Sequence, residues 1–132
     1  MSSLNIIQDH CRSPGILSVK AWIKGGSRYD PCNKKGIHNL FISLLSRGCG
    51  PYKNQEFADI VEGSGAELLC ETYEDGLLIS IKCTENNGYL LLTLLDYMIT
   101  EPHLEQFYID LEKKLVIESI RRQRESPFYL AF

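Results

Sequence analysis

Three stretches of the chain are predicted to be strands, and in two of them hydrophobic and polar residues alternate. In residues 16–23 one face of the chain is aliphatic and the other is mostly polar. A period of two is typical of a strand that buries one face against a core. Two further β-like stretches follow, 66–73 and 77–83; the second alternates in the same way, and residues 74–76 between them read Glu-Asp-Gly. This link favours a hairpin, so we expect a largely antiparallel sheet.

Four further stretches repeat with the period of a helix. The first starts at Ile37, places apolar side chains at i, i+3, i+4, i+7 and i+8, and ends at Gly48. Residues 54–62 and 103–124 are amphipathic, whereas residues 89–99 are strongly apolar but too short to cross a membrane. The order of these elements predicts an α+β fold in which helices pack on the sheet.

The composition narrows the functions that this fold can serve. The chain has 132 residues, with 14 Lys and Arg against 17 Asp and Glu, and a formal net charge of −3. This balance disfavours a nucleic-acid partner, which needs a basic surface. No stretch of about 18 apolar residues is present, and residues 1–10 lack the features of a signal peptide. We therefore expect a cytoplasmic protein without membrane or nucleic-acid partners, whose five cysteines are reduced.

Four short segments occur in an informative order along the chain. They are Val19 to Ser27 with Arg28-Tyr29-Asp30-Pro31 and Gly36-Ile37; Ser46-Arg47-Gly48; residues 62–75 with Thr72 and Asp75; and residues 112–120 with Pro127. Together they resemble the opening of a pitrilysin/insulinase-type zinc metallopeptidase domain of the mitochondrial-processing-peptidase kind. In that family an apolar strand is followed by Gly-Ser-Arg-x-Glu and then by Gly-x-x-His-x-x-Glu-His on a helix.

The resemblance implies the architecture in more detail. We expect a metallopeptidase-like half-domain of the processing-peptidase/LuxS-like type, with residues 14–132 forming the N-terminal portion of one such domain. Residues 1–13 show little periodicity and are expected to be a mobile lead-in. Because the domains of this family are longer, we expect the chain to be truncated.

The same resemblance places the zinc chemistry of the family on four positions. In the family, two histidines at i and i+4 of a helix bind Zn²⁺, the glutamate at i+3 is the base for the metal-bound water, and a distant glutamate completes the ligands. Counted from the flanking motifs, these positions hold Asn39, Ile42, Ser43 and Ser119. None of these side chains offers an imidazole or a carboxylate, so we expect no catalytic residue, no bound metal and no cofactor.

Two neighbouring residues keep a catalytic alternative open. His38 and Glu118 each lie one residue before a replaced position, and they could act as unorthodox ligands of a zinc-dependent metalloendopeptidase. Such an enzyme would still need a third ligand and a base. The simpler interpretation is a partly buried or surface histidine, and a solvated Glu118 that pairs with Arg121 or Arg122. A third alternative is a small binding domain unrelated to proteolysis.

One part of the family scaffold does not depend on the metal. The resemblance implies an edge strand that accepts a peptide as an added strand, made here of Leu68, Leu69, Cys70, Glu71 and Thr72. An ordinary core strand is the alternative. The predicted function is that of a catalytically inactive peptidase-like homologue, acting as a non-catalytic subunit or a peptide-binding scaffold. Its expected partners are an active zinc peptidase subunit of the same family or a second copy of the chain, with a peptide as possible ligand.

Overall fold

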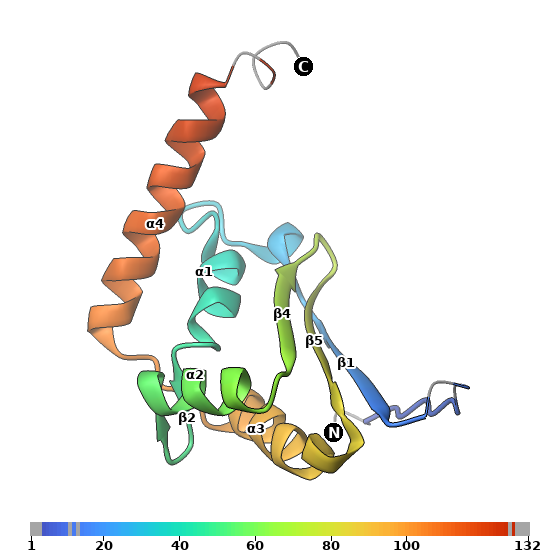
Figure 1. The fold of residues 1–132 in the computed structure, drawn as a ribbon. Helices are drawn as coiled ribbons and strands as arrows, with labels where there is room; N and C mark the ends of the chain where they lie inside the picture. Colours follow the sequence, from blue (N-terminus) through green and yellow to red (C-terminus); the bar gives the residue numbers. More distant parts are fainter. Residues whose placement is uncertain (1–3, 11, 13, 127, 129–132) are drawn as a thin grey trace.

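The main sheet has three antiparallel strands, with β5 at its centre (Figure 1). The computed structural model describes residues 4–10, 12, 14–126 and 128 of the chain. The strands are β1 (Ile16–Lys24), β4 (Glu67–Thr72) and β5 (Gly76–Thr84), in the order β1-β5-β4. Val19 of β1 and Leu68 of β4 both lie opposite Ile81 of β5. The predicted antiparallel sheet is confirmed.

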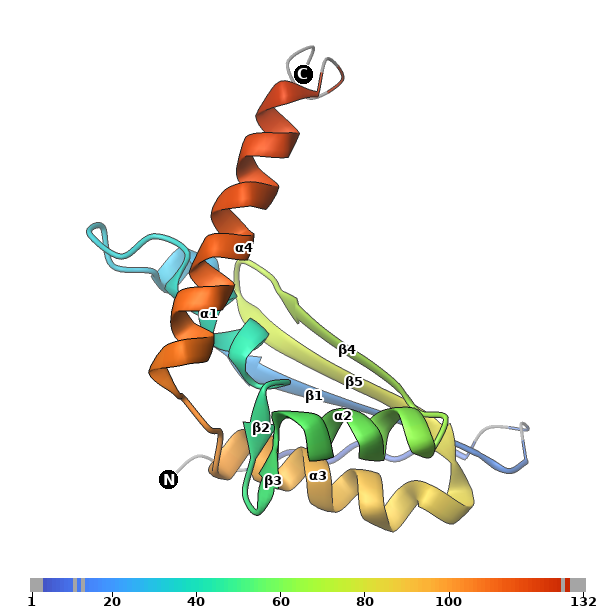
Figure 2. The same cartoon turned by 60° about the vertical axis from the view of Figure 1, so that its left-hand side comes forward.

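Four helices and a small hairpin complete the described fold. The helices are α1 (Ile37–Leu44), α2 (Asn54–Gly63), α3 (Gly88–Thr100) and α4 (Gln106–Glu125). The hairpin pairs β2 (Gly48–Cys49) with β3 (Tyr52–Lys53), and short 3-10 turns occupy Ser27–Tyr29 and Glu85–Asn87. In Figure 2, α2 and α3 lie below the sheet, and the C-terminal half of α4 extends away from the rest of the described chain. The architecture is α+β, as predicted.

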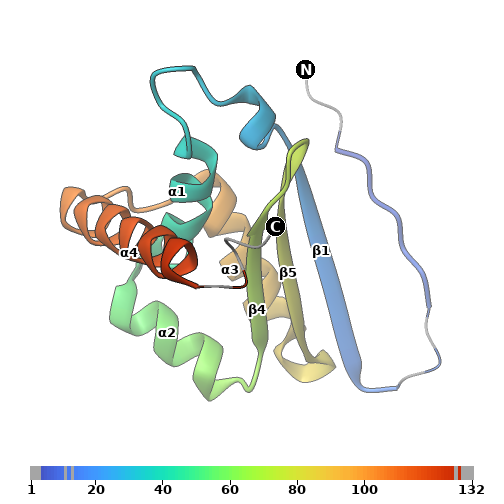
Figure 3. The same cartoon turned by 90° about the horizontal axis from the view of Figure 1, so that it is seen from above.

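One face of the sheet carries the core and the other is open. In β5 the side chains of Leu77, Ile79, Ile81 and Cys83 are buried, whereas most of the residues between them are half-buried or exposed. Figure 3 shows α1, α2 and α4 on the side of the sheet where β4 lies, and β1 at the opposite edge. On the open face Trp22 is 52% exposed. The alternation in the sequence therefore identified the buried face correctly. Helices add the rest of the core, including Ile42, Leu45, Phe57, Leu91, Leu94 and Met98.

The long C-terminal helix begins at Gln106 and not at His103, where the sequence pattern placed its start. The segment after α3 pairs with the hairpin instead. The His103 backbone N–H donates to the Gly48 carbonyl oxygen (3.0 Å), and its Nε2 donates to the Gly50 carbonyl oxygen (2.6 Å). A helix that started at His103 would break these bonds. The hairpin itself was not predicted, because two-residue strands are too short to show a period.

The residues before β1 have no regular secondary structure where the structure describes them. Residues 4–10 and 12 are exposed. The other residues of the expected lead-in 1–13, namely 1–3, 11 and 13, lie outside the described residues, so the mobility of this segment stays a prediction. Within the described part of the chain, no helix is both long enough and apolar enough to cross a membrane.

Candidate functional site

Helix α1, which would carry the family's zinc ligands, is held at its N-terminal end by Asp30. Gly36 turns the chain into the helix with φ at +88°, and glycine offers no side chain to cap the first turn. Asp30, which is only 7% exposed, takes that role. Its carboxylate accepts hydrogen bonds from the backbone N–H of Gly36 (2.7 Å) and of His38 (3.2 Å).

The same carboxylate orients the imidazole of His38. Nδ1 of His38 lies 2.5 Å from Oδ1 of Asp30. This side-chain hydrogen bond holds the pKa of Asp30 below its usual value of 3.8; burial opposes the effect, and the backbone N–H groups of Gly36 and His38 add to it. Asp30 is therefore ionised at neutral pH, and Nδ1 of His38 carries the shared proton. Nε2 is left free to meet a ligand.

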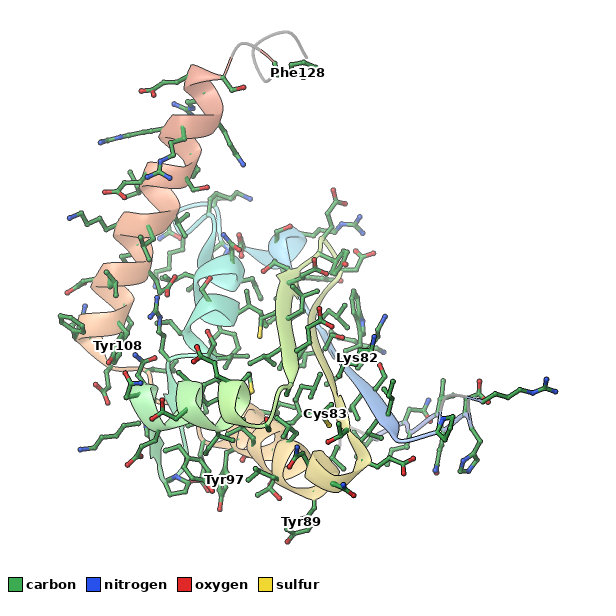
Figure 4. All side chains as sticks on the ribbon, viewed as in Figure 1. Lys82, Cys83, Tyr89, Tyr97, Tyr108 and Phe128 are labelled. Carbon is green, nitrogen blue, oxygen red and sulfur yellow. The ribbon has the colours of Figure 1, made fainter. Side chains whose placement is uncertain are left out.

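The C-terminal end of α1 is held by a second ion pair. The Arg47 guanidinium donates to Oε1 of Glu112 in α4, from Nε at 2.7 Å and from Nη2 at 2.6 Å. It also lies 5.8 Å from the ring centre of Tyr108, near the base of α4 (Figure 4). Asp30 and Glu112 are the two buried charged residues of the described chain. Each fixes one end of α1.

Between these two ion pairs lie Asn39, Ile42 and Ser43, the positions that the resemblance assigns to metal ligands and the base. Asn39 is exposed, and Ser43 is half-buried with its hydroxyl donating to the Asn39 carbonyl oxygen (2.9 Å). Ile42, at the position of the base, is 2% exposed and belongs to the hydrophobic core. The Ile42 side chain thus points inward and packs in the core.

The distal position lies on α4, in the part of the helix beyond Glu112. Ser119 is exposed and Glu118 is half-buried. The ion pair expected between Glu118 and Arg121 or Arg122 does not form among the described residues. No side-chain hydrogen bond fixes Ser119 or Glu118 within the described chain, in contrast to Glu112 one to two turns earlier.

The described residues include no group of three or more His, Cys, Asp or Glu side chains that could hold a metal ion. Burial raises the pKa of the Cys49 and Cys70 thiols to about 11, with Glu101 adding to the effect at Cys49. Both thiols are therefore protonated at neutral pH, and a protonated thiol is a poor ligand and a poor nucleophile.

Strand β4 is an edge strand, in agreement with the family resemblance. It pairs with β5 on one side, and no described strand pairs with its other side. Leu68 and Cys70 are half-buried on the core face, whereas Leu69 is 50% exposed on the open face. Oγ1 of Thr72 is buried and has no hydrogen-bond partner among the described residues. The strand thus offers free backbone groups, while its use by a peptide stays a prediction.

Residues 12–130 match the family described as Insulinase (Peptidase family M16). This chain belongs to the insulinase family. No curated protein sequence matches it.

Solved structures share the insulinase-family fold of this chain. A protease from Helicobacter pylori superposes with a TM-score of 0.80 at 27% identity, over 88% of this chain and 28% of that chain. A peptidase M16 inactive domain from Pseudomonas fluorescens gives a TM-score of 0.81 at 20% identity, over 92% of this chain and 30% of that chain. The chain therefore spans less than a third of each of these proteins.

Sequence reasoning missed the partners that hold α1. Asp30, Arg47 and Glu112 all lie within the segments that resemble the insulinase family, but they were used there only as spacing markers. The sequence did contain a signal for them. When the metal ligands of a family motif are replaced but an acidic residue or an arginine of the same motif is present, that residue has a role other than metal binding. The structure shows that this role is to position α1 and α4.

Proposed function

We propose that this chain is a non-catalytic member of the insulinase family, which binds a peptide or a partner subunit and does not hydrolyse peptides. The observation that carries the proposal is the buried side chain of Ile42 at the position of the catalytic base. Without a carboxylate at that position, α1 lacks the group that takes a proton from the attacking water in the family. The replacement of both histidine positions by Asn39 and Ser43 removes the metal ligands from the same helix.

The retained scaffold supports a binding role. The open edge of β4 can add an extended peptide through backbone hydrogen bonds, which do not require a metal. Glu67 on this strand is exposed, so a peptide with basic residues fits its charge. The similar Pseudomonas fluorescens structure is that of an inactive domain, which agrees with a role for this fold that does not require catalysis. The proposed partners are an active zinc peptidase of the same family or a second copy of this chain.

A specific observation favours one alternative, a zinc-dependent metalloendopeptidase that uses His38 and Glu118. A histidine that binds a metal through one ring nitrogen usually donates the other to a carboxylate, and Asp30 gives His38 this arrangement. The alternative still needs further ligands and a base. A peptide-hydrolysis assay with added Zn²⁺ separates the two functions. We expect no cleavage of an unstructured peptide mixture; cleavage that is lost in His38→Gln would establish the alternative.

Peptide capture by β4 is tested with a short peptide of alternating valine and threonine that carries lysine at both ends. We expect it to bind, and we expect N-methylation of every second backbone amide to reduce binding only when the methylated amides face β4. Methylation of the remaining amides provides the matched control. Equal binding of both methylated peptides, or no binding of the parent peptide, would contradict a backbone-paired complex at the sheet edge.

A further inference from the structure

A hollow of about 480 Å³ lies where the N-terminal end of α1 faces the end of β1 and the start of β5. Figure 1 shows these three ends close together at the top of the sheet. Four apolar side chains, Ile23, Ile37, Phe41 and Leu77, form most of its wall. Its size and apolar walls are those of a site for a small ligand or for one side chain of a larger ligand.

The two polar side chains at this hollow, those of His38 and Lys24, both end in nitrogen. None of the described residues that line the hollow is acidic. The Nε2 edge of His38 lies beside Gly25, where a Cβ atom would be 3.5 Å from Nε2. Neither Nε2 of His38 nor the ammonium group of Lys24 has a hydrogen-bond or ion-pair partner among the described residues.

The position of the imidazole is fixed before a ligand arrives. The side chain of Asp30 is 3% exposed and that of His38 is 25% exposed, and Asp30 is not among the residues that line the hollow. Asp30 also accepts two backbone N–H bonds at the start of α1, which prevents its carboxylate from turning away from Nδ1. Because Nδ1 is held by Asp30, Nε2 is the ring nitrogen of His38 that can contact a ligand in the hollow.

We propose that this hollow binds a carboxylate that is attached to an apolar group. The aliphatic and aromatic wall takes the apolar group, the ammonium of Lys24 donates to the carboxylate, and Nε2 of His38 is the second polar group at the carboxylate. Two sources share this chemistry: a free apolar carboxylic acid, and the C-terminal residue of a peptide. The site is separate from the β4 edge, because it lies beside β1 on the core side of the sheet, and it needs no metal.

Three small probes test the proposal on the whole chain by isothermal titration and by the side-chain NMR signals of His38. They are N-acetyl-leucine, its uncharged amide N-acetyl-leucinamide, and 4-methylpentanoate. We expect N-acetyl-leucine to bind and shift the His38 signals, and the amide to bind at least about tenfold more weakly, since it loses charge-assisted hydrogen bonds. Binding of N-acetyl-leucine assigns the site to a peptide C-terminus, and binding of 4-methylpentanoate alone assigns it to a free acid. Equal binding of the acid and the amide, or no binding of either acid, overturns the proposal.

Variants then locate the binding. His38→Gln and Lys24→Gln should each weaken binding of the carboxylate probe about tenfold. Lys24→Gln leaves the Asp30 contacts intact and so remains informative if His38→Gln disturbs the fold. The matched control is Lys20→Gln, on the same strand but outside the lining of the hollow, which should bind as the unchanged chain does. A loss of affinity in Lys20→Gln equal to that in Lys24→Gln would contradict the assigned site.

Discussion

The two ends of α1 differ from its middle turn in the side chains that they carry. At the ends, Asp30 and Glu112 are buried and make hydrogen bonds to His38 and Arg47. In the middle, the positions that the resemblance assigns to the metal ligands and the base hold side chains that are exposed, half-buried or, for Ile42, packed in the core. We propose that the residues that position the helix are kept here while those of the family's chemistry are lost.

The largest expected effect follows from the substitution Ile42→Glu, which returns the family's base to α1. The new carboxylate would lie in the core without a partner, so we expect the free energy of unfolding to fall by about 4 kcal/mol. Urea denaturation measures this. Asn39→Glu, on the exposed side of the same helix, should change it by less than about 0.5 kcal/mol. A similar small loss of stability in both variants would show that the side chain at position 42 is not packed in the core.

The anchor at the other end of α1 is broken by Glu112→Ala. The Arg47 guanidinium would remain largely buried without its carboxylate, and we expect a loss of about 3 kcal/mol in the free energy of unfolding. Glu118→Ala, on the same helix but without an ion-pair partner among the described residues, should cost less than about 0.5 kcal/mol. Equal losses of stability in these two variants would contradict the idea that Glu112 holds α1 whereas Glu118 does not.

Asp30, at the N-terminal end of α1, should make the stability of the chain depend on pH. Its pKa is lower in the folded state than the usual 3.8, so it contributes stability above the unfolded-state pKa, and this stability is lost as the pH falls through the folded-state value. We expect the free energy of unfolding to fall more steeply below pH 3.8 in the unchanged chain than in Asp30→Asn. Denaturation curves at a series of acidic pH values measure the two slopes, and parallel slopes would contradict the assigned role.

The smallest expected effect concerns the edge strand. Leu69→Lys replaces a half-exposed side chain, so stability should change by less than about 0.5 kcal/mol. An added peptide strand would pack side chains against residue 69, and the new charge should weaken binding of the lysine-flanked valine-threonine peptide about threefold. The control, Lys20→Gln on β1, lies at the opposite edge of the sheet and should leave this affinity unchanged. A fluorescence titration of the labelled peptide compares the two.

Much of the fold could be predicted from the sequence because its long elements have a clear period. The alternation in β5 and the helical stripe that starts at Ile37 identified both the elements and their buried sides. The hairpin β2–β3 was missed because it is fixed by backbone contacts with Pro102 and His103, which leave no pattern in the side chains. The buried acids were missed for a related reason. Charged residues are normally exposed, and only their partners in space show why Asp30 and Glu112 are not.

The zinc content of the chain tests whether this member of the insulinase family has lost its metal site. The chain would be purified without a histidine tag or added metal, and elemental analysis would give the number of zinc ions per chain. Since α1 has neither histidine nor glutamate at the positions assigned to the ligands and the base, we predict a ratio near zero that stays near zero after incubation with Zn²⁺ and dialysis. A ratio near one, lost in His38→Gln, would contradict the account and identify a working metal site.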